Sequence, residues 1–160
     1  MRRVYLLMCL AVMLVGCATT DVTETSIKEA AARVDYGDAS SQTLADRAWK
    51  ALAKKNYPEL FAYTRRCVEL YGEQGKSMNA GLTDFEPPAT AAQKWALNDV
   101  GTCLFIMANA YEQLEMYSEA SQTYHTLAED YYYAQCWDAK GWFWRPAEDA
   151  ARKAKKFRNW

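Results

Sequence analysis

The sequence predicts an all-α domain built from antiparallel helix hairpins. After residue 41, apolar residues recur at three- and four-residue spacing, which is the mark of helices with one buried face. Glycines, prolines and helix-capping residues separate these runs. No run of alternating apolar and polar residues suggests a strand. We expect about two hairpin units, an aromatic segment at 131–144 and a C-terminal capping helix.

The first predicted hairpin follows Ser41, a suitable helix N-cap. Leu44 and Ala48 lie on one apolar face of its first helix. Pro58 is well placed to open the second helix, because the first turn of a helix does not use the N–H group that proline lacks. Gly72 is expected to end that helix.

A long loop is predicted between the two hairpins. Residues 72–88 contain three glycines and two prolines, a composition that favours neither a continuous helix nor a strand. Helical periodicity resumes from about Thr90 to Glu115. A fourth helix is expected to begin at Ser118 and to end near Tyr131.

The segment YYYAQCWDAKGWFW, residues 131–144, has seven aromatic side chains in fourteen positions. Together with the helix after Pro146, it is interpreted first as a cover for the open end of the helix pairs, because each aromatic ring buries a large area. The alternative is a surface on which a sugar or peptide stacks. The residues of that platform are Trp137, Trp142 and Trp144, with Asp138, Lys140 and Arg145 as polar partners.

The N-terminus predicts export. Two arginines precede an apolar run at residues 4–15, which is shorter than the roughly 20 residues that span a bilayer. The quartet LVGC that ends at Cys17 resembles the bacterial lipoprotein box. That resemblance implies cleavage before Cys17 and lipidation of its thiol. With Ala18 next, it also implies an anchor in the outer membrane, facing the periplasm. The alternative is an ordinary signal peptide that contains a cysteine.

Charge limits the classes of partner. The leader carries two of the 19 basic residues, which leaves 17 against 20 acidic residues, a net charge of about −3. This balance argues against nucleic acid, which selects a basic face. The membrane is expected to be contacted through the lipid. The predicted division of the chain is a signal peptide at 1–16, a tether at 17–40 and a helical domain at 41–160, with 72–88 as an insertion loop.

Three cysteines lie beyond the predicted anchor, namely Cys67, Cys103 and Cys136. Their number and spacing do not fit a zinc site or a redox pair. One interpretation is a disulfide between Cys67 and Cys103, on consecutive helices in an oxidising compartment. The other is that all three are small buried hydrophobes. No metal or cofactor site is predicted.

The stretch MANAYEQLEMYSEASQTY, from Met107 to Tyr124, resembles a tetratricopeptide repeat. Ala108 and Ala120 stand where the two helices of a unit must approach closely, and Tyr117 closes the turn between them. The first hairpin shows the same pattern more weakly. The resemblance implies a right-handed superhelical stack of about two units.

Repeats of this type bind other proteins, so the resemblance implies a non-catalytic adaptor in the assembly of an envelope complex. The residues expected to face its groove are Trp49, Phe105, Asn109 and Glu112. Core packing is an equal alternative for Trp49 and Phe105. The single histidine, His125, has no neighbours that complete a catalytic device, and no phosphate loop is present.

Two other classes of function stay open. One is a periplasmic module that binds or processes glycans, such as peptidoglycan, through the aromatic segment 131–144. The other is a structural subunit that assembles with itself.

Overall fold

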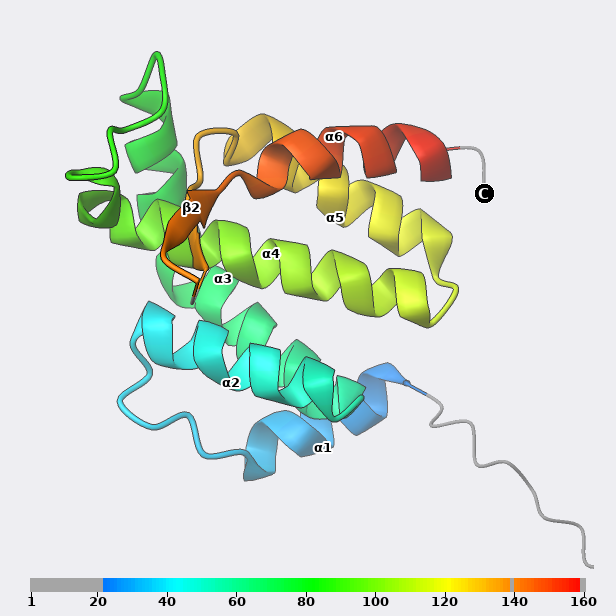
Figure 1. Ribbon diagram of the computed structural model, residues 1–160. Helices are drawn as coiled ribbons and strands as arrows, with labels where there is room; N and C mark the ends of the chain where they lie inside the picture. The colour runs from blue at the N-terminus through cyan, green and yellow to red at the C-terminus, as the bar shows by residue number, and fades with distance from the viewer. Residues whose placement is uncertain (1–21, 139, 159–160) are drawn as a thin grey trace, which may run out of the picture.

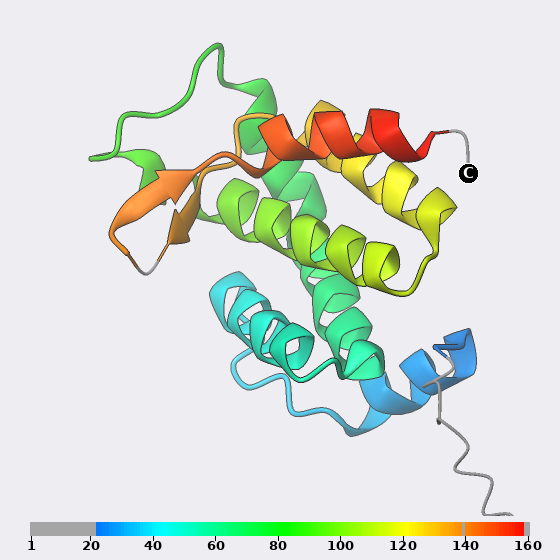
Figure 2. The same ribbon diagram turned by 45° about the vertical axis from the view of Figure 1, so that its right-hand side comes forward.

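The computed structural model describes residues 22–138 and 140–158 and confirms that the domain is mainly helical. Helices α2, α4 and α6 lie one above another toward the viewer in Figure 1, with α3 and α5 behind them; Figure 2 shows the same order after rotation. The elements are α1 (Glu24–Arg33), α2 (Ser41–Ala53), α3 (Tyr57–Ala80), the 3-10 helix η1 (Ala91–Lys94), α4 (Trp95–Gln113), α5 (Tyr117–Asp130), β1 (Cys136–Asp138), β2 (Trp142–Trp144) and α6 (Pro146–Phe157).

Helix α4 is the centre of the core. Consecutive helices from α2 to α6 pack against one another, and α4 also contacts both α2 and α6. Because α4 has neighbours on several sides, it is apolar around most of its circumference and not along one stripe only. Its fully buried residues include Leu97, Val100, Cys103, Ile106, Ala108 and Ala110.

The turns of the two hairpins have the same construction. Lys55, between α2 and α3, and Glu115, between α4 and α5, adopt positive φ values of 54° and 59°. The residue that follows each of them, Asn56 or Met116, donates its N–H to the carbonyl five residues earlier at 2.9 Å. Both turns therefore end one helix and begin the next within a few residues.

Helix α3 is longer than predicted. The expectation that Gly72 ends it is wrong, because the helix continues to Ala80, and the loop predicted at 72–88 is limited to residues 81–88. Gly72 and Gly75 instead lie under the ring of Tyr131. A Cβ on Gly75 would be 3.0 Å from Cε1 of that ring, so the glycines allow a close approach and do not stop the helix.

Part of the predicted tether belongs to the folded domain. Helix α1 lies within the segment 17–40 and packs on α3, where Ile27 and Ala30 are buried. The Arg65 guanidinium also pairs with the Glu24 carboxylate at 2.8 Å. The prediction that residues 17–40 form a tether outside the helical domain is therefore wrong for α1.

The aromatic segment contains a small β-hairpin, which corrects the expectation of no strands. Strands β1 and β2 are antiparallel, with Trp137 opposite Phe143. Gly141 turns the chain with φ of 99°, and Asp138 accepts a hydrogen bond from the Lys140 N–H at 2.8 Å. Strands of three residues are too short for alternation to be recognised in a sequence this rich in aromatic residues.

The predicted signal peptide, 1–16, and the predicted lipidation site, Cys17, lie outside the described residues. Within residues 22–138 and 140–158, no helix combines the length and the apolar character that a membrane crossing requires.

Candidate functional site

A cleft of about 600 Å³ opens between α2, η1, α4 and the β-hairpin. Side chains from α2, η1, α4 and the hairpin line it. It is lined by aromatic rings and by polar side chains. The residues used below are Asp46 and Trp49 from α2, Trp95, Asn98 and Asp99 from α4, and Trp137 and Phe143 from the hairpin.

Three tryptophans present partly exposed rings to this cleft. The exposed fractions are 39% for Trp49, 41% for Trp95 and 60% for Trp137. Trp95 makes an edge contact with Tyr71, at 5.6 Å between ring centroids, and Trp137 makes a similar contact with Phe143 at 5.1 Å. Trp95 and Trp137 are therefore held by neighbouring rings, and all three tryptophans still have free surface for a ligand.

Two carboxylates lie in the same cleft. Asp99 accepts a hydrogen bond from the Ser41 hydroxyl at 2.5 Å. Burial raises the pKa of the Asp99 carboxyl, the Ser41 hydrogen bond opposes this shift, and the nearby Asp46 carboxylate raises the pKa further. The prediction that Ser41 caps α2 is wrong, because Ser40 is the N-cap. The Ser41 hydroxyl instead donates its hydrogen bond to Asp99.

Asn98 ties the walls of the cleft together. Its side-chain nitrogen donates to the Ala91 carbonyl and its side-chain oxygen accepts the Gln135 N–H, both at 2.8 Å. One turn further along α4, Thr102 Oγ1 lies 2.8 Å from the Cys136 sulfur. These contacts fix η1 and the base of the hairpin on α4, so the cleft is held open by buried polar bonds.

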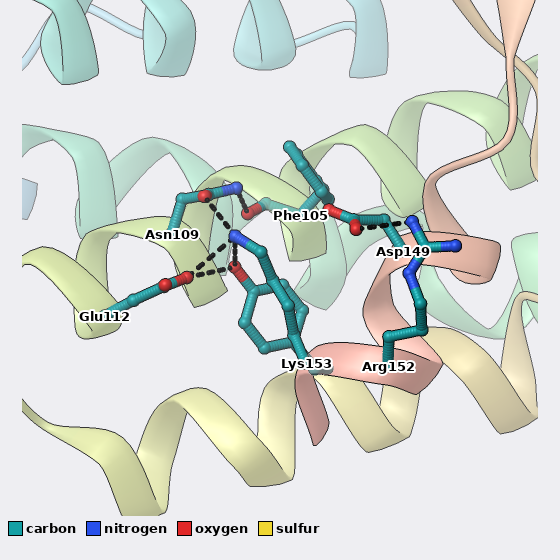
Figure 3. A network of polar contacts seen from close by, with 7 residues as sticks. Phe105, Asn109, Glu112, Asp149, Arg152 and Lys153 are labelled. Carbon is teal, nitrogen blue, oxygen red and sulfur yellow. Dashed lines mark hydrogen bonds and ion pairs between the residues drawn. The ribbon is translucent and has the colours of Figure 1, made fainter. Parts of the chain in front are cut away.

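Of the four residues predicted to face a groove, Trp49 alone lies in this cleft. Asn109 and Glu112 are in contact with Lys153 of α6 (Figure 3). The Lys153 Nζ is 2.8 Å from the Glu112 carboxylate, which also accepts a hydrogen bond from Tyr124 at 3.0 Å. The structure therefore satisfies these polar groups within the chain.

Phe105 belongs to the same region as Lys153. Its ring is 4.8 Å from the ring of Trp144 and 6.3 Å from that of Tyr124, measured between centroids. Trp144, predicted as part of a ligand platform, therefore packs on α4. For Phe105 the structure favours the packing alternative.

The aromatic segment serves two purposes at different residues. Tyr131 is buried, and its hydroxyl donates to the Gly72 carbonyl at 3.1 Å. Trp137 and Trp142 are exposed at 60% and 52%, so the interpretation of the segment as a cover for the helix pairs is wrong for these two residues. The start of the segment covers the helices, whereas the hairpin presents rings to solvent. Lys140 lies over the Trp142 ring at 5.9 Å.

The cysteines Cys67, Cys103 and Cys136 are buried free thiols. The side chains of Cys103 and Cys67 are close enough to interact electrostatically, so the two residues considered for a disulfide are neighbours. Burial raises the pKa of Cys103 and also that of Cys136, the latter to about 12. Among the described residues, no three histidine, cysteine or acidic side chains are grouped to hold a metal ion.

Comparisons with known protein families, with curated protein sequences and with solved structures give no significant match. What the fold and the site define is a helical domain with an open cleft of tryptophan and carboxylate side chains.

Proposed function

We propose that this protein is a lipid-anchored, non-catalytic adaptor of the bacterial envelope, which holds a segment of a partner protein in the cleft between α2 and α4. The observation that carries the proposal is the cleft itself. Three tryptophans with exposed fractions of 39–60% line about 600 Å³ of open space. Partly exposed aromatic rings are enriched where proteins bind other proteins.

The helix arrangement supports tetratricopeptide-like units. The two hairpin turns have matching φ values and hydrogen bonds, at Lys55 and Glu115. In such units the first helix of each pair lines the binding face, and here these helices are α2 and α4. Helix α6 continues the same layer and covers the end of the second unit (Figure 1).

The anchor is tested at Cys17. Replacing Cys17 with alanine should abolish labelling of the protein by radioactive palmitate and release it from the membrane fraction, because the thiol that carries the lipid is lost. Cys9→Ala, within the apolar run of the leader, is the matched control and should leave both unchanged. Continued labelling of the Cys17→Ala protein would contradict the anchor.

The adaptor function is tested by crosslinking from the cleft in intact cells. A photoreactive amino acid at Gln42, which lines the cleft, should give one discrete adduct with a protein partner. The same amino acid at the exposed Gln74 of α3 should not give it. Trp95→Ala should reduce the Gln42 adduct at least about 10-fold, because it removes an aromatic anchor. Equal adducts at both positions, or none at Gln42, would exclude the cleft as the docking site.

A glycan-binding module is the second candidate, and the exposure of Trp137 and Trp142 favours it, because sugars stack on exposed indole rings. Cosedimentation with peptidoglycan separates the two functions. Binding that is lost in Trp142→Ala, with an unchanged helical circular dichroism spectrum, would favour the glycan module over the adaptor.

A further inference from the structure

We infer that the cleft binds an arginine side chain of the partner segment, with the guanidinium between the Asp46 and Asp99 carboxylates and against the tryptophan rings. This inference rests on the proposed function and names the chemistry that the cleft selects. Four features of the described residues lead to it: the sign of the charge, the lack of internal ion pairs, the spacing on the two helices and the surroundings of Asp99.

The charge of the cleft has one sign. Among the side chains that line it, Asp46 and Asp99 carry charge and no lysine or arginine is present. Elsewhere in the described part of the chain, several acids form ion pairs, whereas others, such as Glu73 and Glu129, have none and are exposed to water. Glu24, Asp35 and Glu112, for example, each contact a basic side chain at 2.8–3.0 Å. Neither Asp46 nor Asp99 has such a partner among the described residues, so the cleft presents uncompensated negative charge.

The two helices present matching pairs of an acid and an aromatic ring. Asp46 and Trp49 are three residues apart on α2, and Trp95 and Asp99 are four apart on α4. Residues at these spacings are neighbours on one face of a helix. Each wall of the cleft therefore offers a carboxylate beside an indole. A guanidinium fits this combination because it pairs with carboxylates through its N–H groups and stacks on aromatic rings through its flat face.

Asp99 lies deeper in the cleft than Asp46, which is exposed. Ser41 is the sole hydrogen-bond donor to the Asp99 carboxylate within residues 22–138 and 140–158, and it engages Oδ2, which leaves Oδ1 available. A partly buried carboxylate with one donor gains more from a cation than a solvated one does, since less water has to be displaced. Burial raises the pKa of the Asp99 carboxyl, and no basic side chain among the described residues lowers it.

The experiment compares two peptides that differ in one charge. The full-length protein, purified in detergent, is titrated with Gly-Ala-Arg-Ala-Gly and with the same peptide containing citrulline, the neutral isostere of arginine. Binding is measured by calorimetry and by the shifts of the indole N–H resonances. We expect the arginine peptide to bind at least about 10-fold more tightly than the citrulline peptide, as for the loss of one charged partner in an interface.

Variants assign the effect to the two carboxylates. The double variant Asp46→Asn/Asp99→Asn should weaken binding of the arginine peptide about 10- to 100-fold and leave binding of the citrulline peptide unchanged. The matched control is Glu73→Gln/Glu129→Gln, which removes two exposed acids outside the cleft and should have no effect. The indole spectrum of each variant without peptide shows whether the fold is retained.

The outcomes separate this inference from the proposed function. Equal binding of the two peptides, or no binding of the arginine peptide at millimolar concentration, overturns the arginine site, whereas the Gln42 adduct in cells decides the adaptor independently. Binding of chito-oligosaccharide in place of the arginine peptide also overturns it, and it would assign the same rings to a glycan.

Discussion

Replacing Gly101 with alanine is expected to lower the free energy of unfolding by about 2 kcal/mol, although alanine is the better helix former by about 1 kcal/mol. A Cβ on Gly101 would lie 2.5 Å from the Cβ of Ala134 and 3.6 Å from Leu127 Cδ1. The Ala134 Cβ cannot rotate away, and its backbone N–H is bonded to the Tyr131 carbonyl at 3.0 Å. The helix and the chain after α5 would have to separate.

Urea denaturation measures this effect, and Gly81→Ala is its control. A Cβ on Gly81 would meet nothing closer than the Met78 carbonyl at 3.7 Å, and the φ of Gly81 is −80°, which alanine adopts without strain. That variant should change stability by less than about 1 kcal/mol, in the stabilising direction. If Gly101→Ala is as stable as the parent, residues 131–135 do not pack on α4 as described.

Tyr131→Ala should lower the free energy of unfolding by about 3–5 kcal/mol, the usual cost of removing a buried aromatic ring. Tyr131 has an exposed fraction of 2%, and its ring fills the space left by Gly72 and Gly75 of α3. Its hydroxyl donates to the Gly72 carbonyl, and burial raises the pKa of Tyr131 to about 12. The alanine variant loses both the packing and this hydrogen bond.

Two further variants separate the contribution of the buried ring from that of the hydrogen bond. Tyr131→Phe keeps the ring and removes the hydrogen bond, so it should cost about 1 kcal/mol. Trp142→Ala removes a larger ring from the same aromatic segment, but that ring is 52% exposed, and the cost should stay within about 0.5 kcal/mol. Thermal and urea unfolding of the three variants gives the comparison. An equal cost at Trp142 and Tyr131 would mean that the hairpin belongs to the core.

Local sequence signals predict the helices well where the cause is local. Pro58 and the apolar spacing around Leu44 are sufficient to place α2 and the start of α3. Gly72 gives the wrong helix end because the reason for that glycine is the ring of Tyr131, 59 residues later. The role of such a glycine can be predicted only when the residue that packs on it is known.

The cleft is predictable in part. Trp49 is expected to face a groove and lines the cleft, whereas nothing in the sequence singles out Trp95, which also lines the cleft and is 41% exposed. The paired spacings Asp46–Trp49 and Trp95–Asp99 were present in the sequence, but their meaning depends on α2 and α4 packing side by side. In the same way, the sequence around Glu112 does not predict that its carboxylate forms an ion pair with Lys153 of α6.

The β-hairpin and helix α6 are directly connected in the chain. Arg145 alone separates Trp144 of β2 from Pro146 of α6, and Trp144 rests on Phe105 of α4. A displacement of α6 is therefore expected to move the hairpin residues that line the cleft, Trp137 and Phe143. Because no residue of α6 lines the cleft, a truncation within this helix is expected to change the shape of the cleft indirectly, through the hairpin, before the domain unfolds.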